Sequence, residues 1–129
     1  MPRAERVVVT AAVVERDGAF LVTRRLEGTH LAGFWEFPGG KCEPGESYQE
    51  CLEREMREEL DTGVRVGEEI VTVEHEYADR IVELHFFRCV LTAEPRALLG
   101  QEMRWVPRAE LRRLEFPPAD AALLELLNG

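Results

Sequence analysis

The segment Gly39–Gly63 reads GGKCEPGESYQECLEREMREELDTG, and its spacing sets how the rest of the chain can be organised. Ser47 and Glu50 have the separation of a capping box, in which each side chain bonds the backbone N–H of the other residue. We therefore expect a helix that begins near Ser47 and ends near Leu60. A glycine pair and the strand-like residues 34–37 stand before it. The segment thus predicts a strand, a loop and a helix in succession.

The expected helix carries three acidic residues with helical spacing. Glu55 precedes Glu58 and Glu59 by three and four positions, so all three carboxylates should project from one face. Glu55 and Glu59 are then about 6 Å apart along the helix axis. Like charges this close destabilise an isolated helix, so a compensating cation is expected. The alternative is a solvated acidic surface, which is what most runs of charge form.

The residues around this cluster have the spacing of a known motif. Five residues separate Gly40 from Glu46, seven separate Glu46 from Arg54, and Arg54 begins the sequence Arg-Glu-x-x-Glu-Glu. The pattern resembles the box of the Nudix hydrolases, a family that cleaves nucleoside diphosphates linked to a further group. In that family the box folds as a loop, a helix and a loop, and its glutamates hold a metal. The resemblance therefore implies an enzyme that uses Mg²⁺ or Mn²⁺.

The resemblance also implies a role for each box residue. Arg54 corresponds to an arginine that orients the first helix glutamate, and Glu46 corresponds to a supporting carboxylate. The residues that correspond to metal ligands are Gly39, through its carbonyl, and Glu55, Glu58 and Glu59. Together with Arg54 and Glu46, these glutamates form the expected catalytic set. Asp61 occupies the position of the last box glycine, which should alter only how the helix ends, because aspartate tolerates left-handed conformations.

Hydrolysis of a phosphoanhydride requires neutralisation of the phosphate charge and a positioned water. Magnesium binds oxygen ligands and keeps several waters, so a few carboxylates and the substrate phosphates satisfy it. A cluster of three glutamates can hold more than one ion. We favour Glu55 as the group that accepts the proton of the attacking water, and a loop acid such as Glu102 is the alternative.

Length and charge limit the possible partners. The chain has 129 residues, which suits a single domain over residues 1–129. Its net charge of −9 disfavours a nucleic-acid polymer, whereas a small phosphorylated ligand is compatible with bound divalent metal. The apolar runs are too short to span a bilayer, and no signal sequence opens the chain. We expect a cytoplasmic protein with no membrane partner, either a monomer or a weak homodimer.

The three cysteines, Cys42, Cys51 and Cys89, are an odd number and include no Cys-x-x-Cys pair. Their spacing predicts neither a disulfide framework nor a zinc site, and it suits a reducing cytoplasm. His75 and His85 lie within strand-like runs, where we expect partly buried, hydrogen-bonded side chains.

Apolar runs on both sides of the box predict a sheet. Val7–Val14 is rich in β-branched residues and should be buried on both faces, and residues 16–18 have hairpin-turn chemistry. Pro107 suits the start of a helix. The other expected elements are strands at Phe20–Arg25, Ile70–Tyr77, Ile81–Leu91 and Glu102–Val106, and a helix at Ala119–Leu127. They predict an α/β (α+β) fold with a mixed central sheet between helices. The Nudix fold, which the box resembles, is such an α/β/α sandwich.

Beyond the box, the chain is similar to the MutT-like branch of the family, whose members hydrolyse nucleoside triphosphates to the monophosphate and pyrophosphate. The positions that correspond to the surroundings of the purine in the oxidised-guanine nucleotide hydrolase are Arg25, Phe37, Arg80 and Asp120. This implies hydrolysis of an oxidised purine nucleotide such as 8-oxo-dGTP, and hence nucleotide-pool sanitation and a link to DNA repair. The alternatives are a CTP or dCTP pyrophosphohydrolase, a hydrolase of another linked nucleoside diphosphate, and a catalytically silent sensor that binds nucleotide.

Two departures from that branch bear on specificity and metal binding. Asp120 stands where an asparagine reads the base, and an ionised aspartate only accepts hydrogen bonds, whereas asparagine also donates them. Asp120 should then select bases that present N–H groups, as oxidised guanine and cytosine do. The alternative is that Asp120 caps the terminal helix. Leu99 stands where a further metal-associated glutamate is expected, and Glu102 is the nearest acid.

Overall fold

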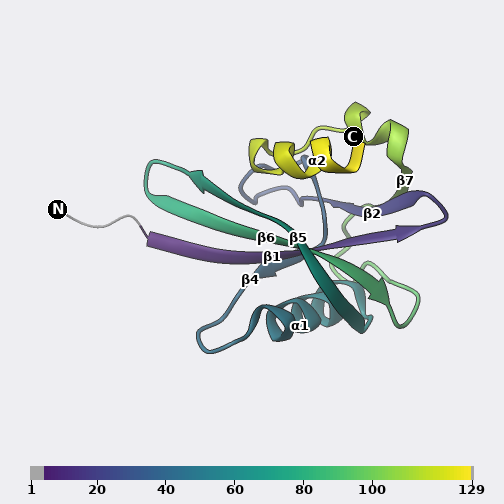
Figure 1. Ribbon diagram of the computed structural model, residues 1–129, viewed down its shortest axis with the longest axis horizontal. Coiled ribbons are helices and arrows are strands. Elements are labelled where there is room, and N and C mark those ends of the chain that lie inside the picture. Colours follow the sequence, from purple (N-terminus) through teal and green to yellow (C-terminus); the bar gives the residue numbers. More distant parts are fainter. Residues whose placement is uncertain (1–4, 129) are drawn as a thin grey trace.

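In the computed structural model, which describes residues 5–128, strands lie between two helices (Figure 1). Helix α1 (Tyr48–Leu60) covers one side of the sheet, and helix α2 (Ala121–Asn128) lies on the opposite side. In chain order, the strands are β1 (Glu5–Arg16), β2 (Ala19–Arg24), β3 (Trp35–Glu36), β4 (Gly39–Lys41), β5 (Val64–Glu76), β6 (Arg80–Leu91) and β7 (Met103–Pro107). The predicted α/β/α arrangement is therefore confirmed.

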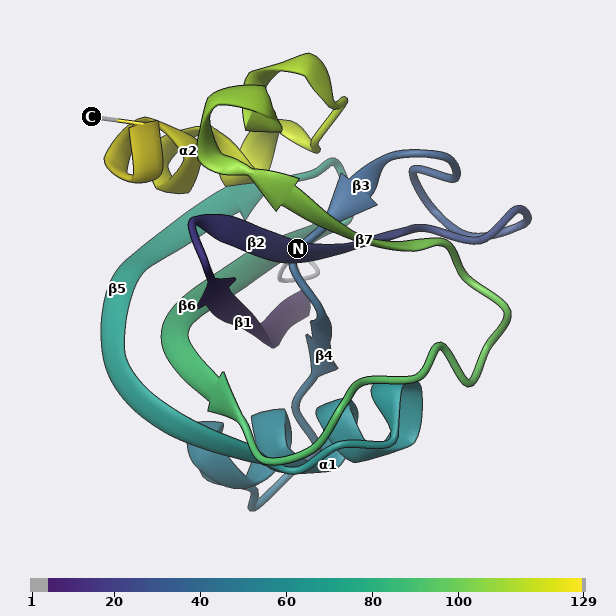
Figure 2. The ribbon, with the colours of Figure 1, turned by 90° about the vertical axis from the view of Figure 1, so that its right-hand side faces the viewer.

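Strand β1 is the centre of the sheet, whose main order is β3-β2-β1-β6-β5. It pairs in parallel with β6 from Glu5 to Val14, and β4 pairs antiparallel with its middle. The last two residues of β1 pair with β2 across a turn in which Asp17 and Gly18 both have positive φ, as a tight hairpin requires. Strand β7 pairs with β2, and Figure 2 shows β5 curving along the outer edge of the sheet. One parallel pair among antiparallel pairs makes the sheet mixed, as predicted.

Two hydrophobic clusters fix the helices to this sheet. Leu52, Met56 and Leu60 recur every four residues of α1, and all three are fully buried against Ala12 and Leu21 of the sheet. On the other side, the buried residues of α2 pack into a second cluster with strand residues; the main members are Leu123, Leu127, Phe20, Val22, Phe37 and Phe86. The sheet thus holds α1, with its acidic residues, in one place.

The ends of α1 follow from local chemistry. The Ser47 hydroxyl accepts a hydrogen bond from the Glu50 backbone N–H, and the Glu50 carboxylate accepts one from the Ser47 backbone N–H, so the capping box is complete. At the other end Asp61 adopts the left-handed conformation, with φ of 53°. The predicted helix from about Ser47 to Leu60 is confirmed, and Asp61 ends it as glycine would.

His85 fixes the beginning of α1 to the sheet. The ring is buried, its Nδ1 faces the Glu69 carboxylate, and its Nε2 lies 2.6 Å from the Glu83 carboxylate. Tyr48, the first residue of α1, stacks on the ring with centroids 4.1 Å apart. The expectation of a hydrogen-bonded histidine within a strand is confirmed, although its burial is nearly complete.

Several elements differ in detail from the prediction. Strand β5 begins at Val64, before the predicted strand at Ile70–Tyr77, and its register with β6 shifts between Val66 and Val71. The segment after Pro107 is a 3₁₀-helix, Arg108–Arg113, and a second one, Pro118–Asp120, leads directly into α2. None of these changes moves α1 or its acidic residues.

The prediction about the cysteines was wrong, since Cys42 and Cys51 form a disulfide. The loop after β4 folds back on the first turns of α1 and brings the two Cα atoms 5.1 Å apart. Their separation of nine residues carries no sign of this in the sequence, because the approach depends on how loop and helix pack. Within residues 5–128 no helix is both long and apolar enough to cross a membrane.

Truncating the α1 core should destabilise the fold. We expect Leu52→Ala to lower the free energy of unfolding by about 2–5 kcal/mol, because it leaves a cavity between α1 and the sheet. Urea denaturation followed by circular dichroism measures this. Leu126→Ala is the matched control, since Leu126 is 56% exposed on α2, and its effect should stay within about 0.5 kcal/mol. Equal effects of the two substitutions would contradict the core described here.

Candidate active site

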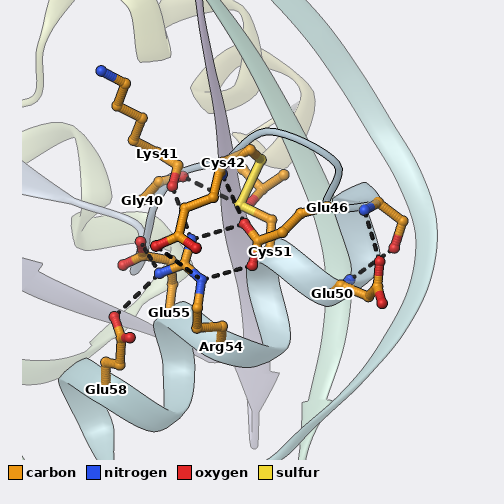
Figure 3. A network of polar contacts seen from close by, with 12 residues as sticks. Gly40, Lys41, Cys42, Glu46, Glu50, Cys51, Arg54, Glu55 and Glu58 are labelled. Atoms are coloured by element: carbon orange, nitrogen blue, oxygen red, sulfur yellow. Dashed lines mark hydrogen bonds and ion pairs between the residues drawn. A yellow bond between two sulfur atoms is a disulfide. The ribbon is translucent and has the colours of Figure 1, made fainter.

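The acidic face of α1 lies against β4 and the loop that joins them. Gly39–Lys41 form β4, residues 42–47 form the loop, and α1 then supplies Arg54 and the acidic side chains (Figure 3). Strand, loop and helix are therefore the three parts of one site, as the box spacing predicts.

Arg54 is the centre of this site. Its guanidinium makes two hydrogen bonds to the Glu46 carboxylate, at 2.7 and 2.9 Å, and one to the Lys41 carbonyl at 3.0 Å. A third nitrogen, Nη1, donates to Glu55 at 2.9 Å and to Glu58 at 3.1 Å. Figure 3 shows these carboxylates converging on the guanidinium. Arg54 thus joins the loop, the strand and two carboxylates of its own helix.

The charges in this network shift the pKa values of its members. The hydrogen bonds from Arg54, with one from the Glu43 backbone N–H, lower the pKa of Glu46 to about 2. The carboxylates around Arg54, first of all Glu46, raise the pKa of the guanidinium above its usual value. Glu46 and Arg54 therefore form a charged pair at neutral pH.

The two box glycines allow β4 to approach its neighbours closely. A Cβ atom on Gly40 would lie 2.4 Å from the carboxyl carbon of Glu55, and one on Gly39 would lie 2.0 Å from the Thr10 carbonyl oxygen. Both distances are far below van der Waals contact. Glycine at position 40 is thus what lets the Glu55 carboxylate sit against the strand.

Glu59 faces the other way, into a cleft of about 170 Å³ between α1, β2 and the loop before β7. Burial, with repulsion from Glu55 and then Glu36, raises the pKa of Glu59 to about 8, although the Gly39 backbone amide opposes this. Burial also raises the pKa of Glu36, against the effect of the Arg25 cation, which is 2.9 Å away. Carboxylates thus crowd together at the base of the cleft.

These residues suit a hard divalent cation by their chemistry. Among residues 5–128 no three acidic, histidine or cysteine side chains already converge as a ligand cluster, because Arg54 binds Glu55 and Glu58. The donors nevertheless are all oxygens, and Glu59 is repelled by both Glu55 and Glu36. A cation relieves such repulsion, and oxygen donors are those that Mg²⁺ and Mn²⁺ prefer.

The four residues expected around a base lie in different surroundings. Arg25 lines the cleft, where it binds Glu36 and the His30 carbonyl. Phe37 is buried in the core and stacks on Phe116, with centroids 5.4 Å apart. Arg80 is exposed where β6 begins and pairs with the neighbouring Asp79. The structure therefore brings Arg25 to the cleft, and it leaves Phe37 and Arg80 away from the residues that line it.

Asp120 is buried, and it lies close enough to Glu36 for the two carboxylates to repel. Burial, followed by that repulsion, raises the pKa of Asp120 to about 7. No hydrogen bond from residues 5–128 reaches the Asp120 side chain, so it does not cap α2 there. At neutral pH the carboxyl group is about half protonated, and the protonated form has both a donor and an acceptor, as asparagine does.

Sequence reasoning missed two residues at the cleft, Glu36 and Gln101. Glu36 lies on a strand between two buried aromatic residues, a position where an acid is unusual, and this was a usable signal. The Gln101 amide donates to the Glu59 carbonyl at 3.2 Å, and its oxygen accepts from the Leu99 N–H, which ties the loop to the end of α1. Nothing in the sequence marks this role.

The loop before β7 contributes no acid to the cleft wall. Leu99 lines the cleft and is 53% exposed. Glu102 instead pairs with Arg24 at 3.0 Å and with Arg104 at 3.3 Å. Glu102 is therefore turned toward two cations and is not among the residues that line the cleft.

Comparison with known proteins identifies the family of this chain. Residues 9–126 match the family model described as NUDIX domain. The chain is 38% identical over 125 residues to the CTP pyrophosphohydrolase of Escherichia coli strain K12, a match that covers 92% of this chain and 89% of the relative. It is 35% identical over 125 residues to the 8-oxo-dGTP diphosphatase of Haemophilus influenzae. That match covers 95% of this chain and 92% of the relative.

Solved structures have the same fold. The solution structure of the Escherichia coli ORF135 protein superposes with a TM-score of 0.84 at 37% identity, over 95% of this chain and 88% of that one. The crystal structure of the MutT protein from Methanosarcina mazei Go1 superposes with a TM-score of 0.87 at 26% identity. That match covers 99% of this chain and 96% of the other. Because the family match spans nearly the whole described chain and the relatives match over most of their length, this protein belongs to the Nudix family.

Proposed function

We propose that this chain is a Mg²⁺- or Mn²⁺-dependent pyrophosphohydrolase of nucleoside triphosphates, with an oxidised purine nucleotide such as 8-oxo-dGTP as its substrate. The products are the nucleoside monophosphate and pyrophosphate, which amounts to sanitation of the nucleotide pool. The observation that carries the proposal is the Arg54 network, which fixes Glu55 and Glu58 beside the cleft that Glu59 lines. The relative named 8-oxo-dGTP diphosphatase, at 35% identity, supports the substrate.

CTP or dCTP hydrolysis is the second candidate, because the relative at 38% identity is a CTP pyrophosphohydrolase. The 4-amino group of cytosine offers an N–H to the Asp120 carboxylate, as N7–H of oxidised guanine does. A catalytically silent sensor is disfavoured, since every charged residue of the box is present. The cytoplasmic location and the state of monomer or weak homodimer remain predictions.

The residues of the box divide the work between them. The metal would be held by the carboxylates of Glu55, Glu58 and Glu59 with the Gly39 carbonyl. When bound, the cation neutralises phosphate oxygens and lowers the pKa of a coordinated water. Arg54 keeps two of these carboxylates in place, and Glu46 keeps Arg54 in place through its two hydrogen bonds. Their combined role is to orient ligands rather than to touch substrate.

Proton transfer falls to this chain's own carboxylates. Glu55 is the favoured acceptor, because burial raises the pKa of its carboxylate and brings it nearer to the working pH. Glu102, which pairs with Arg24 and Arg104, is the alternative acceptor.

Pyrophosphate release from a panel of 8-oxo-dGTP, dGTP, CTP and dCTP, with and without Mg²⁺, tests the proposed function. We expect activity on 8-oxo-dGTP or a cytidine triphosphate only when metal is present. Full activity in excess chelator would contradict the metal-dependent reaction, and binding of all four nucleotides without any product would favour the sensor.

Removing one proposed metal ligand should separate activity from stability. We expect Glu59→Gln to lower kcat by about 100-fold or more, since an amide replaces a charged ligand. The melting temperature of the metal-free protein should stay the same or rise, because one of three repelling carboxylates is gone. Glu53→Gln, on the same helix and outside the ligand set, is the matched control and should leave both quantities unchanged. A fall in melting temperature with Glu59→Gln would contradict the crowding described for the metal-free site.

Loss of Arg54 should affect turnover more than substrate binding. In Arg54→Ala, Glu55 and Glu58 lose their common donor, so we expect kcat to fall by about 10- to 100-fold with a smaller change in KM. Arg57→Ala removes an exposed arginine one turn along the helix and should change neither. Steady-state kinetics on the best nucleotide of the panel decides this. A variant that raised KM alone would show that Arg54 binds substrate.

The protonation of Asp120 should set base preference. Above its pKa of about 7 the carboxylate only accepts hydrogen bonds and faces the bare N7 acceptor of dGTP unfavourably. Below that pKa the carboxyl O–H can donate to N7. We therefore expect the ratio of kcat/KM for 8-oxo-dGTP over dGTP to rise about fivefold or more between one pH unit below and one above this pKa.

Asp120→Asn is the control, because its amide does not titrate. We expect the ratio to become independent of pH and the ranking among bases to change more than the rate on the best one. Taking a ratio at each pH removes titrations shared by both substrates, including those of Glu36 and the metal site. A flat ratio in the wild-type protein would mean that another residue reads the base.

A further inference from the structure

The disulfide links the start of the loop that carries Glu46 to α1, the helix that follows it. Cys42 directly follows β4, and Cys51 lies in the second turn of α1. Figure 3 shows the bond between them beside the Arg54 network. The Cα separation of 5.1 Å lies within the normal range for disulfides, so β4 and α1 need not move for the bond to form.

The two sulfurs differ in access. Cys51 is fully buried, whereas Cys42 is partly exposed at the start of the loop. Cys42 is therefore the more accessible of the two to a reagent from solution, and Cys51 is shielded from one. Cys89 lies in the core beneath α1, and burial raises the pKa of its thiol to about 12. Cys89 is thus an inert internal reference for the other two.

The surroundings of Cys51 suit a free thiol as well as a disulfide. The Thr10 hydroxyl lies 3.2 Å from the sulfur and can donate to it in either state. The Gly40 carbonyl oxygen lies 3.7 Å from the sulfur and can accept from the thiol S–H. After reduction the buried Cys51 thiol therefore still has hydrogen-bond partners. Both the thiol and the disulfide of Cys51 are thus compatible with its burial.

The loop between the cysteines also controls Arg54. Within the segment 43–46, Glu46 hydrogen-bonds Arg54 through both carboxylate oxygens, and the Glu43 carboxylate lies 3.9 Å from the guanidinium. The Lys41 carbonyl, next to Cys42, provides a further bond to the same guanidinium. The disulfide ties Cys42, at the start of the loop, to α1, and it therefore restricts the position of Glu46. Because Glu46 binds Arg54 and Arg54 binds Glu55, the disulfide also restricts Glu55.

We propose that Cys42 and Cys51 are a reversible oxidation site, at which a peroxide or a small disulfide forms the bond and a dithiol breaks it. The proposal concerns a site that the proposed function does not use. Only its effect on turnover rests on that function.

The oxidation balances with hydrogen peroxide as the oxidant. The Cys42 thiolate attacks one peroxide oxygen, which gives a sulfenic acid and releases hydroxide. That hydroxide takes up the proton lost by the thiol and leaves as water. The Cys51 sulfur then attacks the sulfenic sulfur, its thiol proton joins the departing hydroxyl, and a second water leaves as the S–S bond forms. A dithiol reverses the change. One of its thiols attacks the Cys42 sulfur and releases the Cys51 thiol. Its second thiol then releases the Cys42 thiol, and the dithiol is oxidised to a disulfide.

Oxidation should stabilise the arrangement that the structure shows. Closing a loop of this length limits the unfolded chain, which predicts a melting temperature about 5–15 °C higher for the oxidised protein. We expect kcat to fall about 2- to 10-fold on reduction, less than the loss of an orienting partner causes, because Glu46 still binds Arg54.

The experiment uses the full chain after treatment with hydrogen peroxide or with dithiothreitol. Thiols are counted with a maleimide after unfolding, a peptide map identifies the linked pair, and melting temperature and kcat are measured for each state. We expect one free thiol, that of Cys89, after peroxide and three after dithiothreitol. Cys89→Ala should keep the full response. Cys42→Ala should match the reduced wild-type protein in melting temperature and show no response to peroxide.

Three results would overturn the proposal. One is three free thiols after peroxide, and another is a linked pair that includes Cys89. The third is a Cys42–Cys51 bond whose formation changes neither melting temperature nor kcat. If thiol count and melting temperature respond as expected while no nucleotide is hydrolysed in either state, the oxidation site stands and the proposed function fails. The two conclusions are therefore tested separately.

Discussion

The site depends on the guanidinium of Arg54 and the carboxylates that surround it. A planar guanidinium offers several donors in fixed directions, so one side chain can hold Glu46, Glu55 and Glu58 at once. Lysine, as a single point charge, cannot reproduce this. Arg54 offsets the repulsion among the residues it touches, whereas Glu59 has Glu55 and Glu36 as its main charged neighbours. Glu59 is therefore the carboxylate whose repulsion Arg54 does not offset, and a divalent cation bound beside it would relieve that repulsion.

The rest of the fold brings opposite sides of the sheet to this cleft. Glu59 comes from α1, which the Leu52 cluster fixes to one face of the sheet. Asp120 comes from the segment before α2 on the other side, and Arg25 follows β2 between them. Glu36 and Glu59 both line the cleft, and Asp120 lies behind Glu36, close enough for the two carboxylates to repel. The residues proposed for metal binding and those proposed for base preference therefore come from different elements of the fold.

The sequence predicted best what local chemistry decides. The capping box located α1 because Ser47 and Glu50 satisfy each other without help from the rest of the fold. Periodicity placed the strands and the hairpin of β5 and β6 for similar reasons. It could not show that Cys42 meets Cys51, or that Gln101 binds the end of α1, because these contacts join segments whose approach only the folded chain sets. Residue identity likewise gave no sign that burial raises the pKa of Asp120 to about 7.

The central claim is that Arg54 orients carboxylates that hold divalent metal, and Mn²⁺ binding tests it most directly. Electron paramagnetic resonance measures free Mn²⁺ during titration of the wild-type protein and of Arg54→Ala, without substrate. The account predicts the same number of bound ions in both proteins and an affinity about 10- to 100-fold weaker in the variant. Equal affinities would contradict the account, because the carboxylates would then need no orienting guanidinium.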